Sequence, residues 1–138
     1  VGGEIRAGNS KSPTHSWQVA VEEPVSSKRE VHKVIKLDNS AMATSGDYRN
    51  YFEVEGKRYS HTIDPRDGKP ISHDLVSATV IMPSCADADA WATAMMVLGP
   101  DLGLQIAEAN NLAVYMIVKA GSGFDSRYSP AFGRYINE

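Results

Sequence analysis

The sequence has few of the features that identify a protein class by themselves. It has one cysteine, Cys85, so no internal disulfide can form. It has no apolar run long enough to cross a bilayer. Its net charge is −3 at pH 7, and without a basic cluster it gives no reason to expect a nucleic-acid partner. What remains, 138 residues of which 42% are hydrophobic and 22% charged, is typical of one soluble globular domain or a large part of one.

Several catalytic motifs are also missing. No Gly-x-Ser-x-Gly and no Gly-x-Gly-x-x-Gly occur, so a serine hydrolase and a Rossmann cofactor site are unsupported. No cluster of Cys and His offers a metal site. The chain begins Val-Gly-Gly-Glu-Ile with no Met and no visible signal peptide. We interpret this start as a position within a domain, which leaves room for a targeting segment upstream.

Apolar and polar residues alternate through much of the chain, which predicts strands. The residues from 75 to 82 are the most apolar, so we expect a central strand that is buried on both faces. Glu55-Gly56 is expected to join the predicted strands 49–54 and 57–61 in a hairpin, because Gly56 can supply the positive φ of a tight turn. The other predicted strands are residues 2–7, 16–22, 31–37, 41–44 and 112–118, with a final edge strand at 128–136.

The clearest helix starts after Ser84 and ends at Gly99-Pro100. Ser84 can cap it, and Asp87 three residues later completes a capping box. We expect its core stripe to be Ala90, Trp91, Ala94, Met95 and Leu98. Asp101 is expected to cap a second helix over residues 102–109. Strands followed by a helix pair and another strand predict an α+β fold, mostly an antiparallel sheet with the helix pair packed on it.

The stretch His61-Thr-Ile-Asp-Pro-Arg-Asp-Gly-Lys-Pro70 carries more chemistry than a connection needs. Pro65 and Pro70 restrict the residues before them, and Asp67-Gly68 predicts a tight turn. A stiff polar loop on a scaffold is a common place for a site. The alternative, a solvated surface turn, stays open because loops are polar by default. His61 itself is either a general base or phosphate donor, or a hairpin-end histidine bonded to a backbone carbonyl.

On the capped helix, Asp89 and Thr93 are four residues apart and therefore share a face. Their oxygens suit Mg²⁺, which would need further oxygens from other groups. The alternative is that Asp89 is a solvated helix charge and that Thr93 bonds back to the Asp89 carbonyl. A metal site predicts that both side chains face a cavity, and that the His61 loop meets this helix at one rim. The remaining histidines, His15, His32 and His73, are interpreted as surface residues.

Four stretches in order carry a family resemblance: Val-Gly-Gly-Glu-Ile-Arg at 1–6, Ala-Thr-Ser-Gly-Asp-Tyr at 43–48, Tyr-Ser-His-Thr-Ile-Asp-Pro at 59–65 with Gly68 and Pro70, and Asp-Ala-Asp-Ala-Trp-Ala-Thr-Ala at 87–94. Together they resemble the ApbE-like FAD:protein FMN transferases, once described as thiamine-biosynthesis lipoproteins. The match runs nearly end to end. Family members are roughly twice as long, within the range that larger domains fill. The resemblance therefore implies that residues 1–138 are the C-terminal portion of an ApbE-like (T-fold-like) domain.

The resemblance implies a Mg²⁺-dependent enzyme that cleaves FAD and attaches FMN, by a phosphoester, to a Thr or Ser of a flavoprotein. Subunits of the sodium-translocating NADH:quinone reductase are the expected kind of partner. It also implies that Asp89, the Ala92 carbonyl and Thr93 bind the metal, and that His61 and Ile63 belong to the flavin-nucleotide site, with His61 assisting the attacking hydroxyl. The implied location is the bacterial periplasm, on a lipid anchor in the inner membrane. Two alternatives stay open: hydrolysis of FAD to FMN and AMP, and flavin binding without turnover.

Overall fold

The computed structural model describes residues 3–10, 12, 15–22, 24, 31–47 and 51–136, with the backbone alone at 51, 52, 57 and 58. Its centre is a five-stranded sheet in which every neighbouring pair is antiparallel. The strand order is β1 (Ile5–Arg6), β4 (Ala41–Gly46), β9 (Leu75–Met82), β10 (Ala113–Ala120) and β11 (Gly123–Tyr128). The expected α+β fold with a mostly antiparallel sheet is confirmed.

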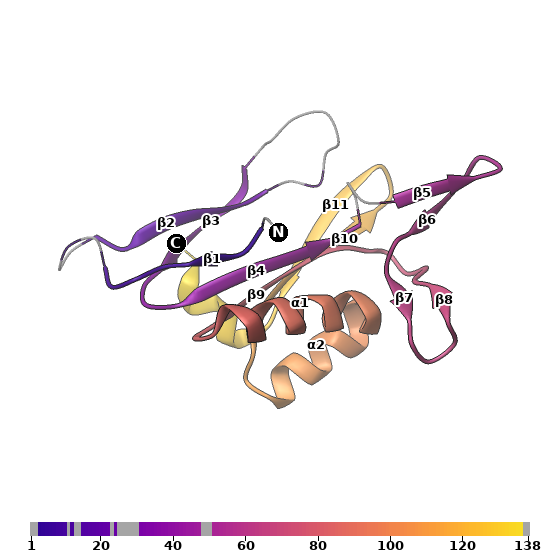
Figure 1. Cartoon of the computed structure of the whole chain (residues 1–138). Coiled ribbons are helices and arrows are strands. Elements are labelled where there is room, and N and C mark those ends of the chain that lie inside the picture. Colours follow the sequence, from indigo (N-terminus) through magenta and orange to yellow (C-terminus); the bar gives the residue numbers. More distant parts are fainter. Residues whose placement is uncertain are drawn as a thin grey trace.

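Both faces of this sheet are covered, as Figure 1 shows. Helices α1 (Cys85–Leu98) and α2 (Pro100–Ala109) lie on one face. The hairpin of β2 (Trp17–Glu22) and β3 (Val31–Leu37) lies on the other, together with the 3-10 helix η1 (Pro130–Tyr135). Residues of β10 alternate between the two cores: Val114 and Met116 pack with the helices, whereas Tyr115 and Ile117 pack with Phe132 of η1.

Strand β9 lies where its apolar sequence predicts, between β4 and β10. Val80 packs on the helix side and Ile81 on the hairpin side, and both are buried. Strand β4 extends two residues beyond the predicted end at Thr44, because Ser45 and Gly46 pair with Ala78 and Ser77. The predicted end of this strand at Thr44 is therefore two residues too early. Sheet pairing holds these small polar residues in the strand although their sequence resembles a turn.

The first helix begins as its cap predicts. The Ser84 side chain accepts a hydrogen bond from the backbone N–H of Asp87 at 3.3 Å. The predicted core stripe is partly wrong: Ala90 is exposed, and the fully buried residues are Ala88, Ala92, Met95 and Met96. Alanine occurs on several faces of this helix, so hydrophobicity alone could not orient it. Packing against β4 and β9 decides the orientation.

The second helix begins earlier than predicted, at Pro100, with Gly99 as its cap residue. Proline is favoured at the first helical position, because the N–H that it lacks has no partner there anyway. Asp101 therefore lies inside the first turn. Its carboxylate accepts a hydrogen bond from Arg127 Nη1 at 2.8 Å instead of capping the helix.

The predicted edge strand at 128–136 is wrong. The edge strand is β11, paired with β10 from Tyr115↔Tyr128 to Ala120↔Gly123. The buried Ser129 hydroxyl then donates to the Leu112 carbonyl at 2.6 Å and accepts from the Val114 N–H at 3.0 Å. Pro130 begins η1, which inserts Phe132 into the core. The spacing of apolar residues in this 3-10 helix is similar to the alternation of a strand, which explains the wrong prediction.

The predicted hairpin is confirmed as β5 (Tyr51–Val54) and β6 (Lys57–Ser60). Glu55 has φ 51° and Gly56 has φ 74°, and two positive φ values in succession are those of the turn that matches strand twist. Residues 49 and 50 of the predicted strand, and Gly2 of the first one, lie outside the described residues.

Candidate functional site

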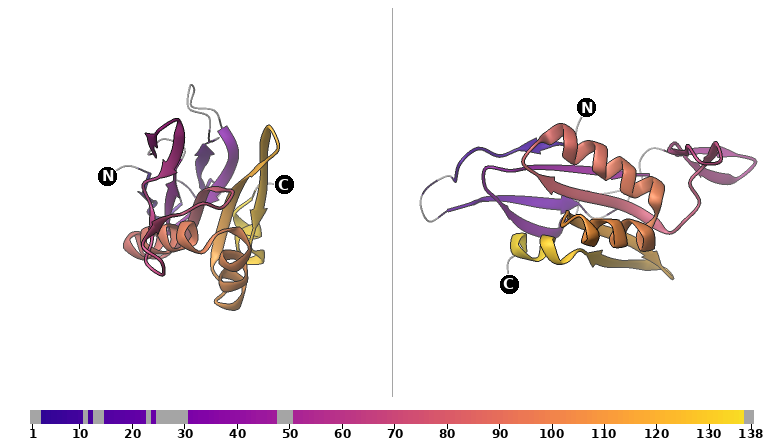
Figure 2. Two further views of the ribbon diagram at one scale, coloured as in Figure 1. Left: turned by 90° about the vertical axis from the view of Figure 1, so that its right-hand side faces the viewer. Right: turned by 90° about the horizontal axis from the view of Figure 1, so that it is seen from below.

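The loop from His61 to Pro70 is a small hairpin of its own. Strands β7 (Ile63–Asp64) and β8 (Lys69–Pro70) pair antiparallel, with Ile63 opposite Pro70. The expected tight turn is present: the N–H of Gly68 donates to the Asp64 carbonyl at 2.8 Å, and Gly68 has φ 72°. Figure 2 shows β5 to β8 projecting beyond the end of the sheet. The loop is therefore structured by backbone pairing as well as by proline.

Asp64 and Arg66 form a two-pronged ion pair inside this hairpin. Arg66 Nη2 lies 2.6 Å from Asp64 Oδ2, and Arg66 Nε lies 2.9 Å from Asp64 Oδ1. The backbone N–H of Arg66 also donates to Oδ1 at 2.9 Å. Hydrogen bonds from the Arg66 side chain, and then from its backbone, lower the pKa of the Asp64 carboxyl from 3.8 to about 2. The same partner raises the pKa of Arg66.

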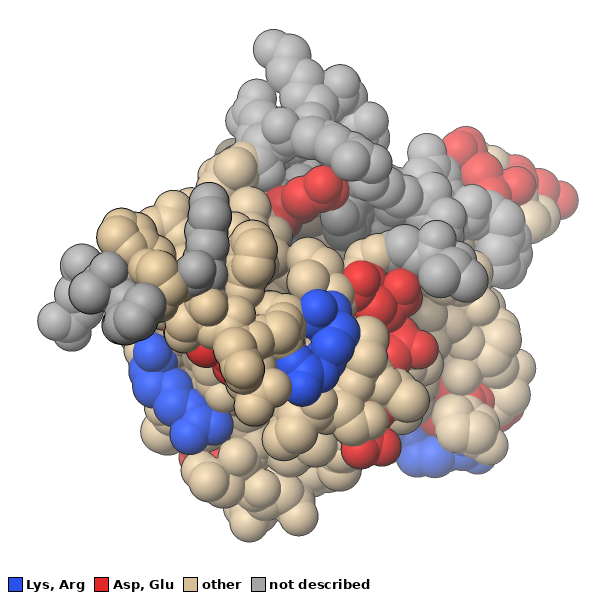
Figure 3. Space-filling view, turned by 60° about the vertical axis from the view of Figure 1, so that its left-hand side comes forward, with Lys and Arg blue, Asp and Glu red and all other residues tan. Residues whose placement is uncertain are grey.

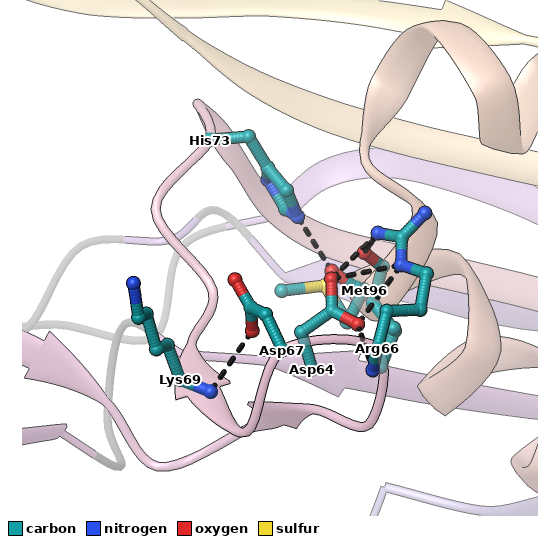
Figure 4. Close-up of polar contacts among 7 residues, drawn as sticks. Asp64, Arg66, Asp67, Lys69, His73 and Met96 are labelled. Atoms are coloured by element: carbon teal, nitrogen blue, oxygen red, sulfur yellow. Dashed lines mark hydrogen bonds and ion pairs between the residues drawn. The ribbon is translucent and has the colours of Figure 1, made fainter.

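The loop is fixed to the C-terminal end of α1 by two side chains, which Figure 4 shows. Arg66 Nη2 donates to the Val97 carbonyl at 3.3 Å, and His73 Nε2 lies 2.6 Å from the Met96 carbonyl oxygen. His73 Nδ1 accepts from the Leu75 N–H at 3.2 Å, so the ring proton belongs on Nε2, which donates to Met96. The last carbonyls of a helix lack partners within it, and these two side chains supply them.

His73 is a residue that the sequence interpretation misplaced. The sequence predicts a surface position for it, whereas it is half-buried and bonded at both ring nitrogens. The one signal in the sequence is its position two residues before the core strand β9, which does not reveal a partner 23 residues away. Arg66 likewise carries no sequence signal for its bond to the Val97 carbonyl.

The residues assigned to the metal lie on α1. Asp89 and Thr93 are exposed and Ala92 is buried. The Thr93 hydroxyl lies 3.2 Å from the Ser45 hydroxyl at the end of β4. The expectation that Asp89 and Thr93 face a common cavity stays a prediction, because exposure of both side chains fits an open cleft as well as bulk solvent. Within the described ranges, no three Asp, Glu, His or Cys residues come together as a metal site.

His61 and Ile63 lie on the same hairpin as the ion pair. His61 is exposed, and Ile63 is 48% exposed although it is a large apolar residue. Arg66 and His73 bond the loop to α1 at Val97 and Met96, in the last turn. That His61 itself lies close to the Asp89 and Thr93 face stays a prediction. A helix rises about 1.5 Å per residue, which puts Thr93 about 6 Å and Asp89 about 12 Å before Val97 along the axis. The roles assigned to these residues stay predictions.

A pocket of about 580 Å³ lies at the opposite end of the sheet, where β9 ends and β10 begins. The residues that line it are Ser16, Lys36, Asp38, Ser40, Ile81, Met82, Pro83, Asn111, Leu112, Ala113, Arg134 and Tyr135. Figure 3 shows the molecule from this side, with basic side chains in separate groups and acidic ones between them. Because β9 enters the sheet beside the loop and leaves it at this pocket, the two features are separated by the length of the strand.

Comparison with known proteins places the chain in a family. The model of the ApbE family matches residues 1–116. This chain belongs to the ApbE family. Among its curated relatives, the FAD:protein FMN transferase of Haemophilus influenzae is 49% identical over 133 residues, which are 96% of this chain and 38% of that protein. The enzyme of the same name from Escherichia coli K12 is 43% identical over 136 residues, 99% of this chain and 39% of that protein.

Solved structures of ApbE proteins have the same fold. The apo form of the Pseudomonas stutzeri flavinyl transferase ApbE superposes with a TM-score of 0.82 at 43% identity, over 99% of this chain and 42% of that one. The ApbE protein of Thermotoga maritima superposes with a TM-score of 0.83 at 31% identity, over 99% of this chain and 43% of that one. The chain thus spans about two-fifths of the length of its relatives. No helix in the described part is long and apolar enough to span a membrane.

Proposed function

We propose that this chain is the C-terminal part of an FAD:protein FMN transferase, which moves FMN from FAD to a hydroxyl of a protein. One observation carries the proposal. A rigid hairpin that holds His61 and Ile63 is bonded to the last turn of the helix that holds Asp89 and Thr93. The family to which the chain belongs, and the printed names of its relatives, supply the substrate.

The proposed reaction exchanges the phosphoanhydride bond of FAD for a phosphoester bond to the acceptor. A Thr or Ser oxygen of the acceptor attacks the FMN phosphorus of FAD and forms a new P–O bond. The pyrophosphate P–O bond breaks, and AMP leaves with the bridging oxygen. The hydroxyl proton goes to the imidazole of His61, which acts as general base. Ile63, which is 48% exposed, would contact the flavin-nucleotide, as its place in the family motif implies.

The chemistry of the donor atoms on α1 fits Mg²⁺. Asp89 offers a carboxylate, Thr93 a hydroxyl and Ala92 a backbone carbonyl, and all are the hard oxygen ligands that this ion prefers. Because Asp89 and Thr93 are exposed, water, phosphate oxygens of FAD and groups outside the described residues can complete the coordination. The ion would neutralise charge on the pyrophosphate during cleavage.

Two alternatives use the same residues. In the first, water replaces the acceptor hydroxyl, so that FAD is hydrolysed to FMN and AMP. In the second, the protein binds flavin without turnover. The test is to incubate the full-length protein with FAD, with and without Mg²⁺, and to follow AMP by chromatography. Mg²⁺-dependent AMP release supports an enzyme, and its dependence on an acceptor protein separates transfer from hydrolysis. FAD binding without AMP release, when Mg²⁺ and an acceptor flavoprotein are both present, contradicts the proposal.

The partner and the location are further proposals that rest on the family. The acceptor would be a flavoprotein such as a subunit of the sodium-translocating NADH:quinone reductase. The protein would act in the bacterial periplasm, held at the inner membrane by an N-terminal lipid. Cell fractionation of the full-length protein, with and without globomycin to block lipoprotein processing, tests the location. A mature protein found only in the cytoplasm contradicts it.

A further inference from the structure

We propose that three side chains, Asp64, Arg66 and His73, form a clamp that positions His61 relative to α1, and that His73 is its central member. None of the three is proposed to touch the reacting atoms, so they are positioning residues. The inference rests on the proposed function for its catalytic consequence. Its structural part, the clamp itself, rests on contacts in this chain alone.

The hairpin is attached to the last turn of α1 at two adjacent residues. Arg66 and His73 lie seven residues apart in the loop, yet they bond to the adjacent carbonyls of Val97 and Met96. Two attachments to neighbouring carbonyls restrict sliding of the hairpin along the helix. Asp64 holds the guanidinium of Arg66 in place through both of its carboxylate oxygens.

Backbone hydrogen bonds connect the two strands of the hairpin close to His61. The N–H of Ile71 donates to the Thr62 carbonyl at 3.1 Å, and β7 pairs with β8, so both strands of the hairpin move together. Thr62 is the chain neighbour of His61, and its own N–H donates to the Ser60 hydroxyl at 3.1 Å. Hydrogen bonds and the short covalent segments of the loop between them thus connect the end of α1 to the backbone next to His61.

The imidazole of His73 is held in its orientation from three sides. Nδ1 accepts from the Leu75 N–H, and Nε2 donates to the Met96 carbonyl. A Cβ at Gly99 would lie 3.0 Å from His73 Cδ2, so the ring fills the space that the glycine leaves. The α1 helix carries Asp89 and Thr93, so the same ring that holds its end sets the distance between the proposed metal ligands and His61. A misplacement of about 1 Å can cost about 10²-fold in rate.

Two substitutions distinguish the contributions of the hydrogen bonds made by the two ring nitrogens of His73. The amide nitrogen of glutamine reaches as far as Nε2, so His73→Gln can keep the bond to the Met96 carbonyl. The shorter asparagine reproduces only Nδ1, so His73→Asn can keep the Leu75 contact but loses the bond to α1. Arg66→Gln removes the second attachment from an exposed side chain, and Arg127→Ala is the matched control. Arg127 makes an exposed ion pair with Asp101 at 2.8 Å, against 2.6 Å for Arg66 and Asp64, and this pair joins β11 to α2.

The experiment measures FMN transfer and hydrogen exchange in the full-length protein. We expect His73→Asn and Arg66→Gln to lower kcat by about 10- to 100-fold with KM for FAD little changed, whereas His73→Gln and Arg127→Ala stay close to wild type. Amide exchange of residues 61–71 should accelerate in the first two variants and not in the last two. If His73→Asn does not fold, Arg66→Gln carries the same test.

Three results would overturn the clamp. One is His73→Asn and Arg66→Gln with unchanged exchange in residues 61–71. Another is His73→Gln as impaired as His73→Asn, since the Met96 bond would then not matter. The third is a loss in which KM alone rises, which would make these residues substrate contacts. A wild-type protein that transfers no FMN overturns the proposed function instead, and the exchange comparison still decides the clamp.

Discussion

His73 Nε2 lies 2.6 Å from the carbonyl oxygen of Met96, so a histidine before one core strand closes the end of the helix that follows this strand. The helix carries Asp89 and Thr93, and the loop before His73 carries His61 and Ile63. His61 and Asp89, which are 28 positions apart in sequence, thus lie on two segments that the side chains of Arg66 and His73 join. The loop and the last turn of α1 are thus joined by side-chain hydrogen bonds.

The Asp64 carboxyl should titrate with a pKa of about 2, below its ordinary value of 3.8. A folded-state pKa that is lowered adds stability that is fully present above pH 3.8 and is lost as the pH falls through 2. Arg66→Gln should return the pKa towards 3.8, because the Arg66 hydrogen bonds are the main cause of the shift. Carbon-13 NMR titration of the carboxyl checks both. A wild-type Asp64 that titrates near 3.8 would show that the ion pair does not form in solution.

Gly99→Ala should destabilise the protein by about 1–3 kcal/mol, because backbone of this kind is nearly exclusive to glycine. Gly99 has φ 81° and ψ 176°, and a Cβ there would press on the His73 ring at 3.0 Å. Gly8→Ala is the control, since Gly8 has no atom within 4 Å of the new Cβ. Urea unfolding measures both variants. Equal stability of the two would mean that the junction of α1 and α2 is not held as described.

Ser129→Ala should cost about 1–3 kcal/mol, because it leaves the buried Val114 N–H and Leu112 carbonyl without their partner. Ser122→Ala, in the exposed turn before β11, should change stability by less than about 0.5 kcal/mol. Thermal unfolding compares them. A Ser129→Ala protein as stable as wild type would favour the edge strand that the sequence predicted here over the observed 3-10 helix.

The elements that the sequence predicted well are those in which local signals agree with burial. Ser84 marks the start of α1, and the apolar run of β9 marks the central strand. Failures occurred where distant contacts decide the structure. Ser129 turns the chain because it satisfies two backbone groups of β10, and Ala90 is exposed because α1 packs on two strands at once. For the site, motifs pointed to the loop and to α1, whereas the bond that joins them involves a backbone carbonyl, which leaves no trace in the sequence.

Asp89→Ala in the full-length protein should abolish Mg²⁺-dependent turnover, because it removes the only carboxylate among the three proposed ligands. Asp87→Ala is the matched control: it removes an exposed carboxylate two residues earlier on α1 and should keep activity near wild type. AMP release at several Mg²⁺ concentrations measures the effect. Activity of Asp89→Ala near that of wild type would refute the metal assignment.

His61 is proposed to assist an acceptor hydroxyl at a site built by the loop and α1. This role is tested by the mass of a purified acceptor flavoprotein after incubation with the full-length protein, FAD and Mg²⁺, together with FAD binding by calorimetry. We expect one FMN added per AMP released, a transfer rate about 10²- to 10⁴-fold lower in His61→Ala, and FAD affinity close to wild type in that variant. An acceptor that gains no FMN, or a His61→Ala protein that loses affinity and rate in equal proportion, would contradict it.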